Sequence, residues 1–389
     1  MKLEGVRVLD LSAFLPGPHL TMTLSDHGAD VIMVEPANGV GEPTRAVGYR
    51  DSDDVSVWFR NIARGKRSLR VNLKDAEGRR FFHRLAEGAD VVVESFRPGV
   101  AARLGVDYET LAATNPRLVY CSISAFGQNG PLRDKPAHDL TVQALAGVAA
   151  LNRGLEDGKP AAPNIPAADA ISSLTALSAI LMALLRRERT GRGEYIDIAM
   201  YDALLAWTPN VTGPVFAEDA HPEPANMRSF GGSAMYRIYE TSDGEFLVLG
   251  GSEVKFARNL LAAFDRLDLL PFAELEPGPV QEPLRAFFRE RFRSRPRAHW
   301  ERFLEPVDCC WAFVRSLKDA FDDPHTIQRE MLLRDATGHR HIGVPIKFAK
   351  EPARPRLELP AYGQHSAELG ESVGLASADL AALRARGTI

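Results

Sequence analysis

Apolar runs and helical stretches alternate along the first 125 residues. Apolar runs rich in β-branched residues occupy 6–11, 30–35, 68–73, 90–94 and 118–123. Stretches with helical periodicity separate them, as at 15–28 and 75–87. Short buried strands that alternate with helices predict a parallel sheet with helices on both faces. We therefore expect an α/β fold with an open, Rossmann-like sheet.

The pattern changes after this alternation. Residues 140–207 read as mostly helical, with an apolar helix over 176–189 and one more strand over 195–200. Later elements are expected as a hairpin with strands at 234–239 and 245–250, helices at 254–264 and 283–292, and a β-like run at 342–348. This order predicts a large α/β domain over 1–215, a smaller α+β domain over 216–325, and a C-terminal return to the large domain over 326–389.

Composition narrows the class of protein. The 389 residues carry a formal net charge of −4, and 45% are hydrophobic, which suits a globular protein rather than a nucleic-acid binder. No leader pattern and no apolar run near the ~18 residues of a membrane span is seen, so no membrane partner is expected. The cysteines are Cys121, Cys309 and Cys310. An odd count with a vicinal pair, expected to be buried, favours a reducing cytoplasm.

Two kinds of cofactor are not expected. The sequence has no C-x-x-C or H-E-x-x-H pattern, so we expect no metal site. The first strand–helix turn, Ala13 to Pro18, lacks G-x-G-x-x-G, and its two prolines remove N–H groups that would face a pyrophosphate. NAD binding is therefore not expected, although Glu35 lies where a ribose-binding acid would lie.

Basic residues gather around the ends of predicted strands. The cluster of Arg60, Arg64, Lys66 and Arg67 precedes the run at 68–73 and is either a solvated surface or a docking site for phosphate. Arg97 follows the run at 90–94, at the strand end where open α/β sheets bind ligands. A phosphorylated ligand other than NAD fits this distribution.

Four residues are candidates for acid–base chemistry. His138 and Asp139 precede one predicted helix, Asp169 precedes the long apolar helix, and Glu253 precedes the helix at 254–264. Imidazole and carboxylate groups exchange protons near neutral pH, and helix-start N–H groups stabilise anions. The alternative is that the carboxylates only cap helices.

These motifs together resemble the class III CoA-transferase family, which also contains the 2-methylacyl-CoA racemases. The resemblance covers nearly the whole chain. It is carried by Val8-Leu9-Asp10-Leu11, Arg64-Gly65-Lys66-Arg67-Ser68, Glu94-Ser95-Phe96-Arg97-Pro98-Gly99, His138-Asp139-Leu140, Asp169, Arg189-Thr190-Gly191-Arg192-Gly193 and Ser242-Asp243-Gly244. It implies an interlocked homodimer with CoA on the large domain. By position, the residues implied to contact CoA are Phe14, Arg64, Lys66, Arg67, Val71, Arg97 and Arg103.

The resemblance implies two reactions of acyl-CoA. In racemases, His138 and Asp169 would exchange the α-proton of a 2-methylacyl-CoA, with Asp139 or Glu253 orienting the histidine. This is our main expectation. The alternative is CoA transfer to a free carboxylic acid, with Asp169 as nucleophile. Residues 170–173 (AISS) depart from the glycine-rich racemase pattern at this point. A catalytically silent acyl-CoA-binding protein is the third possibility, and the acid–base set speaks against it.

Overall fold

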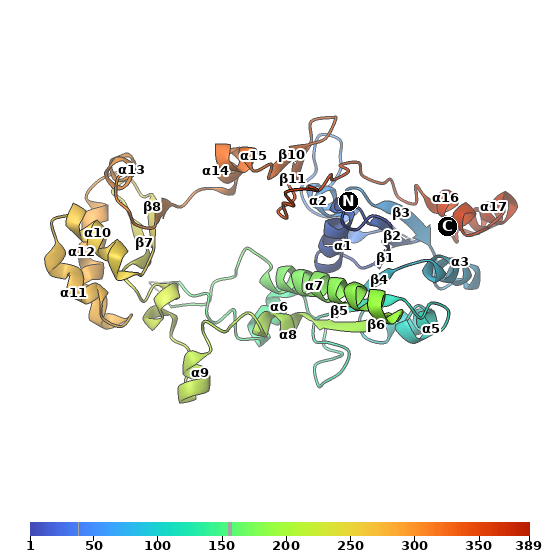
Figure 1. The fold of residues 1–389 in the computed structure, drawn as a ribbon, viewed down its shortest axis with the longest axis horizontal. Coiled ribbons are helices and arrows are strands. Elements are labelled where there is room, and N and C mark those ends of the chain that lie inside the picture. The colour runs from blue at the N-terminus through green and yellow to red at the C-terminus, as the bar shows by residue number, and fades with distance from the viewer. Residues whose placement is uncertain (38, 155–157) are drawn as a thin grey trace. The chain divides into compact units, whose positions relative to one another are not determined.

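The computed structural model describes residues 1–37, 39–154 and 158–389. The chain forms two compact units (Figure 1). The first unit comprises Met1–Ala146, Asn164–Trp207 and Pro324–Ile389, and the second comprises Gly147–Pro163 and Thr208–Asp323. The chain therefore leaves the first unit and returns to it twice.

The first unit is built on a parallel sheet. Among the described residues its six strands are β1 (Arg7–Leu11), β2 (Asp30–Pro36), β3 (Arg67–Val71), β4 (Val91–Glu94), β5 (Val119–Ser124) and β6 (Glu194–Ala199). Their order across the sheet is β3-β2-β1-β4-β5-β6, and all neighbouring pairs are parallel. The predicted open parallel sheet is thus confirmed. The strand order reverses between β1 and β4, where such sheets open a crevice for ligands.

Helices cover both faces of this sheet (Figure 1). The helices of the first unit are α1 (Pro16–Asp26), α2 (Val57–Ala63), α3 (Ala76–Glu87), α4 (Val100–Leu104), α5 (Tyr108–Ala112), α6 (Asp139–Leu145), α7 (Ala167–Thr190), α8 (Met200–Leu205), α15 (Pro324–Gln328), α16 (Ser366–Ser372) and α17 (Ser377–Ala385). One face packs Leu9, Ile32 and Leu69 against Phe82 of α3 and Leu369 of α16. On the opposite face, α7 packs against α1 and β5.

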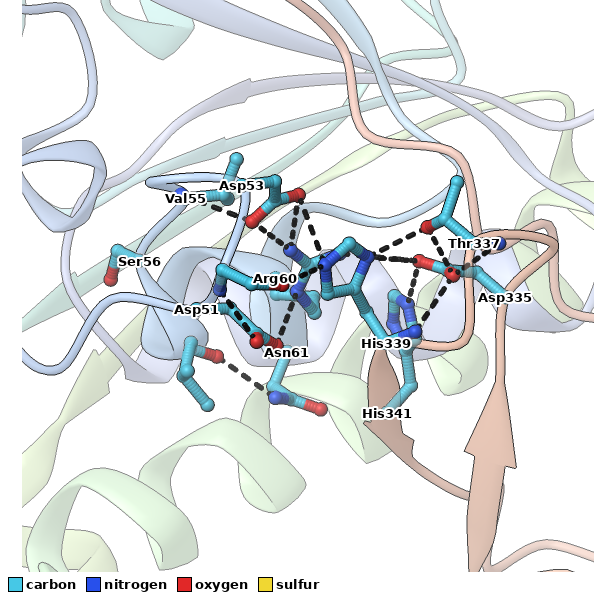
Figure 2. A network of polar contacts seen from close by, with 12 residues as sticks. Asp51, Asp53, Val55, Ser56, Arg60, Asn61, Asp335, Thr337, His339 and His341 are labelled. Carbon is cyan, nitrogen blue, oxygen red and sulfur yellow. Dashed lines mark hydrogen bonds and ion pairs between the residues drawn. The ribbon is translucent and has the colours of Figure 1, made fainter.

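A polar network joins α2 to the hairpin of β10 (Leu332–Arg334) and β11 (Arg340–Ile342) (Figure 2). The buried Arg60 guanidinium donates to Asp53 at 2.6 Å and to Asp335 at 3.2 Å. His341 lies 3.3 Å from Asp335, from Nε2 to Oδ2. Arg60 therefore ties the returning C-terminal segment to the first unit, because a buried guanidinium needs such partners.

The second unit has an antiparallel sheet and an aromatic core. Its strands are β7 (Tyr236–Glu240), β8 (Phe246–Gly250) and β9 (Trp311–Phe313), paired in that order. Its helices are α9 (Gly213–Glu218), α10 (Val254–Ala263), α11 (Leu270–Ala273), α12 (Glu282–Arg293), α13 (Arg297–Leu304) and α14 (Leu317–Asp322). Phe264, Phe288, Phe292 and Trp300 pack against one another in the core. The predicted hairpin and the two helices after it are confirmed.

Three local predictions are wrong. The stretch from 140 to 207 is interrupted, because α6 ends at Leu145 and α7 begins only at Ala167. Of the run predicted at 342–348, only Ile342 belongs to a strand. The next residue, Gly343, packs closely against the backbone of Glu330 and Met331. Cys310 is exposed and Cys309 half-buried, because their segment lies at the surface just before the edge strand β9.

Candidate active site

Two cavities of about 410 Å³ each lie at the carboxyl ends of the strands in the first unit. We call the first the His138 cavity. Its lining includes Phe14, Arg97, Arg133, Lys135, His138 and Asp169. We call the second the Val71 cavity. Its lining includes Leu11, Met33, Glu42, Val71, Leu73 and Leu104. Ala13 and Phe96 line both cavities, so the loops that follow β1 and β4 separate them.

Asp169 lies in the first turn of α7 and faces the His138 cavity. The helix begins after Pro166, which offers no side-chain cap. The cap comes from Asp139 of α6, whose Oδ1 accepts the N–H groups of Ala168 at 2.8 Å and Asp169 at 3.1 Å. Asp139 therefore fixes the start of α7 and the backbone of Asp169. The alternative in which each carboxylate caps its own helix is wrong for both residues.

The surroundings of Asp169 favour its protonated form. Burial, followed by the negative charge of Asp139, raises the pKa of Asp169 to about 7. Both causes disfavour a second negative charge at this place. A carboxyl group with a pKa near neutrality can act as a base or as a nucleophile near pH 7, and it is typical of functional sites.

His138 is the N-cap residue of α6 and is exposed in the His138 cavity. Its imidazole meets the ring of Phe14 edge to face, with ring centres 5.9 Å apart. The carboxylate next to it in sequence is engaged elsewhere, because Asp139 accepts α7 N–H groups through Oδ1 and the amide of Gln143 through Oδ2 at 2.6 Å. The structure thus brings His138 and Asp169 into one cavity and gives Asp139 a capping role.

The predicted basic cluster is mostly internal. Arg64 is 1% exposed and donates to both oxygens of Asp26. Lys66 is also buried and donates to Asp10 at 3.1 Å, to Thr21 at 2.7 Å and to the carbonyl of Pro18 at 2.9 Å. The solvated-surface interpretation is wrong here, because these charges are neutralised by buried carboxylates. CoA contact by Arg64 and Lys66 stays a prediction.

The other predicted CoA-contacting residues differ in accessibility. Arg97 is exposed and lines the His138 cavity. Arg103 is exposed on α4, and Phe14 is 40% exposed. Arg67 pairs with Asp30 and Glu368, and Val71 lines the Val71 cavity. Arg97 and Arg103 are therefore the members of the set whose cations face solvent.

The carboxylate of Glu35 is not free to bind a ribose. Its carboxylate is buried, accepts Arg45 at 2.7 and 2.8 Å, and also accepts the N–H of Glu42 at 2.8 Å. An acid that is to bind a ribose must offer free oxygens. The contacts of Glu35 thus agree with the missing glycine pattern in the loop after β1.

Glu253 belongs to the second unit, where it is the exposed N-cap residue of α10. Its predicted catalytic role stays a prediction. Sequence reasoning missed Arg133, Lys135 and Glu42, which line the two cavities. Arg133 and Lys135 precede His138 by a few residues, and this closeness in sequence could have identified them as cavity residues. Glu42 had none, because a single acid in a glycine-rich stretch is usually a surface residue.

Comparisons with known proteins identify the family of this chain. The family model of CoA-transferase family III matches residues 3–366. Acetyl-CoA:oxalate CoA-transferase from Acetobacter aceti is 32% identical, over 91% of this chain and 92% of that protein. Succinyl-CoA:glutarate CoA-transferase from Mus musculus is 30% identical, over 95% and 86%.

A solved structure has the same fold. The crystal structure of a CAIB/BAIF family protein from Brucella suis matches 95% of this chain and 99% of that chain, with a TM-score of 0.82 and 29% identity. The resemblance drawn from the sequence motifs is therefore confirmed. This chain belongs to CoA-transferase family III and is an enzyme of that family that acts on CoA thioesters.

Proposed function

We propose that this enzyme transfers CoA from an acyl-CoA to a free carboxylate, with Asp169 as the nucleophile. The observation that carries this proposal is the position of Asp169. Its backbone N–H is held by Asp139, its carboxyl group has a pKa raised to about 7, and it lines a cavity with cationic walls. The relatives described above are named as CoA-transferases, which supports transfer over the racemisation that we expected first.

The reaction proceeds through covalent intermediates on Asp169. The carboxylate attacks the thioester carbonyl carbon, the C–S bond breaks, CoA leaves as thiolate, and an acyl-aspartyl anhydride remains. The thiolate then attacks the aspartyl carbonyl carbon, which releases the donor acid and leaves an aspartyl-CoA thioester. The acceptor carboxylate attacks this thioester, and the returning thiolate then takes the new acyl group and frees Asp169. Each step exchanges one anion for another, so no proton donor is needed.

We assign the two ends of CoA to the two cavities. The Val71 cavity is lined mainly by apolar side chains and suits the adenine end, whereas the His138 cavity holds Asp169 and suits the thioester. Ala13 and Phe96 belong to both linings, so a single extended molecule can pass along them. Arg97 and Arg103 are exposed cations for the phosphate groups.

We infer that the acceptor is a dicarboxylate. The reacting carboxylate must approach the aspartyl thioester, so a second carboxylate needs its own cationic partner. Arg133 and Lys135 line the His138 cavity and supply that charge. The relatives described above are named for oxalate and glutarate, which are both dicarboxylic acids.

We also propose that the enzyme is a homodimer. Helix α7 is 24 residues long and, by length and composition alone, apolar enough to cross a membrane, so the expectation that no apolar run approaches the length of a span is wrong for this helix. It instead packs against α1, α8 and the sheet of its own unit. Leu174, Leu181, Met182 and Leu185 remain exposed along one side, at spacings that share a helix face. A second copy covering this side would remove apolar surface from water.

Racemisation of a 2-methylacyl-CoA is the second candidate. The observation that favours it is that His138 and Asp169 line the same cavity, as a two-base mechanism requires. An enolate also needs hydrogen-bond donors. Two of the N–H groups at the start of α7 donate to Asp139 and are not available for that purpose.

One experiment separates the two reactions. The enzyme is incubated in D2O with one of two acyl donors, a chiral 2-methylacyl-CoA or succinyl-CoA. The acceptor is either glutarate or the monocarboxylate pentanoate. Hydroxylamine is added to trap a covalent intermediate. Transfer predicts glutaryl-CoA, a hydroxamate on Asp169, and at least tenfold less product from pentanoate. Asp169→Asn, which keeps the size of the side chain, should lower turnover by about 10³-fold or more and form no adduct.

The opposite pattern would overturn the proposal. Deuterium at the α-carbon and loss of optical purity, with no adduct on Asp169 and no new acyl-CoA, would assign the racemase reaction. Equal use of glutarate and pentanoate would retain transfer and remove the dicarboxylate acceptor.

A further inference from the structure

Phe14 has an unusual backbone conformation for its residue type. Its φ is +67°, in the left-handed region, which residues with a Cβ atom rarely adopt. Such a conformation is unfavourable by itself and persists only where neighbouring groups hold it. Phe14 lies in the loop between β1 and α1, which separates the two cavities.

Side chains hold three successive N–H groups of this loop. The N–H of Ser12 donates to Asp10 at 3.0 Å, and the N–H of Ala13 donates to the hydroxyl of Ser95 at 3.0 Å. The N–H of Phe14 itself donates to Oε1 of Glu42 at 2.9 Å. Glu42 is therefore the acceptor that bears directly on the left-handed residue.

Glu42 is itself fixed. Its side chain is 3% exposed, and its second oxygen accepts the N–H of Thr44 at 2.7 Å and the hydroxyl of Thr44. Its own N–H donates to Glu35, whose carboxylate is paired with Arg45. A buried carboxylate with this many fixed donors is an anchor rather than a surface charge.

The two ends of this contact face different cavities. Glu42 lines the Val71 cavity together with its neighbours Gly41 and Pro43. Phe14 lines the His138 cavity, and its ring packs edge to face on His138. The hydrogen bond from Phe14 to Glu42 thus joins the wall of one cavity to the wall of the other.

We propose that Glu42 is a positioning residue that couples the two cavities through Phe14. A ligand packed on Gly41, Glu42 and Pro43 favours the arrangement in which Glu42 holds Phe14 left-handed. The ring then stays against His138 and completes the wall beside Asp169. Relaxation of the strained residue opposes the held arrangement, so a ligand that prefers the held arrangement shifts the population toward it. The inference rests on the proposed function, because it assigns the adenine end of CoA to the Val71 cavity.

A double-mutant cycle tests the role of Glu42. Glu42→Met keeps the length of the side chain but removes both acceptor oxygens and with them the contact with the N–H of Phe14, so it should lower kcat for succinyl-CoA about tenfold with KM changed less than threefold. Glycine adopts φ +67° without strain, so Glu42→Met added to Phe14→Gly should change kcat less than twofold. Thr44→Val is the matched control, because it removes a donor to Glu42 but leaves the contact with Phe14. It should leave kcat within about twofold.

A split substrate tests the coupling itself. The succinyl thioester of pantetheine lacks the nucleotide, and 3′-phosphoadenosine 5′-diphosphate supplies it separately. The nucleotide should raise wild-type turnover of the truncated thioester at least fivefold and should raise that of Glu42→Met less than twofold. Calorimetric titration with CoA shows whether each variant is folded and binds.

The outcomes separate this inference from the proposed function. A wild type that transfers CoA, with equal loss on Glu42→Met in both Phe14 backgrounds, would overturn the coupling alone. Equal activation of the wild type and Glu42→Met by the nucleotide would do the same. A wild type that binds CoA but transfers none would overturn the proposed function and the coupling with it.

Discussion

The His138 cavity and the Val71 cavity have the same volume and share one edge of a sheet, yet they differ in chemistry. The first holds a histidine, a carboxyl group of raised pKa and three cationic side chains. The second is lined by strand residues, by Glu35 paired with Arg45, and by Glu42, whose pKa is also raised by burial but whose oxygens already accept backbone N–H groups. The reversal of strand order creates the space for both, and the loops decide what each can do. Binding and chemistry can thus be changed separately.

The cationic residues show the same division. Arg64 is buried against Asp26 at the end of α1, and Lys66 is buried against Asp10 of β1 and the carbonyl of Pro18 in α1, so both cations tie α1 to the rest of the unit. Arg97, Arg133 and Lys135 line the His138 cavity. Charge in one region therefore stabilises the fold, and charge in the other lines a cavity, where Arg133 also pairs with the exposed Asp134 at 3.3 Å.

The largest expected effect is a loss of turnover at the His138 cavity when Asp139 is substituted. Asp139→Ala removes the cap of α7, and misplacement of Asp169 should lower kcat about 100-fold. Asp139→Asn keeps an acceptor for α7 and removes the charge that raises the pKa of Asp169, so the midpoint of the rate against pH should fall below 7. Rates measured from pH 5 to 9 check both. An unchanged midpoint would show that burial alone sets this pKa.

A smaller effect should separate binding in the two cavities. Arg97→Ala should weaken CoA binding about tenfold, and less so at high salt, because a charge-assisted contact with phosphate is lost. Val71→Ala removes part of an apolar wall and should weaken binding by about threefold without salt dependence. Calorimetry with CoA at two salt concentrations measures this. Equal salt dependence for both variants would contradict the assignment of the two ends of CoA.

The smallest effect concerns stability. The folded-state pKa of Asp169 is about 7 against an ordinary value of 3.8, so the folded state holds the proton more tightly. Wild-type stability from this group is therefore lost as pH rises from about 4 to 7. Asp169→Asn should be more stable than the wild type by about 1–2 kcal/mol at pH 8, after allowance for solvent screening, and equal to it near pH 4. Denaturant unfolding at both pH values measures this.

The exposed carboxylate of Glu253 provides the control for that measurement. Glu253→Gln should show no pH-dependent gain. A gain for Glu253→Gln as large as that for Asp169→Asn would mean that net charge, rather than the surroundings of Asp169, sets the effect.

The parallel sheet and the hairpin were predictable because their signals are local. Buried strands such as 90–94 are continuous apolar runs, and Ser242-Asp243-Gly244 is a turn signal between alternating strands. The break between α6 and α7 was missed because residues 146–166 contain no strong stop before Pro160 other than glycines. Local apolar content there resembles that of a helix.

By itself, the sequence determined the elements of the sheet, the family motifs and the candidacy of His138 and Asp169. Only the tertiary structure decided what their neighbours do. Asp139 caps a helix that begins 28 residues later, and Glu42 holds a backbone 28 residues before it. Hydrogen bonds of this kind depend on which loops meet at the end of the sheet. Periodicity along the chain reports burial and helical or strand spacing, but it carries no information on contacts between distant loops.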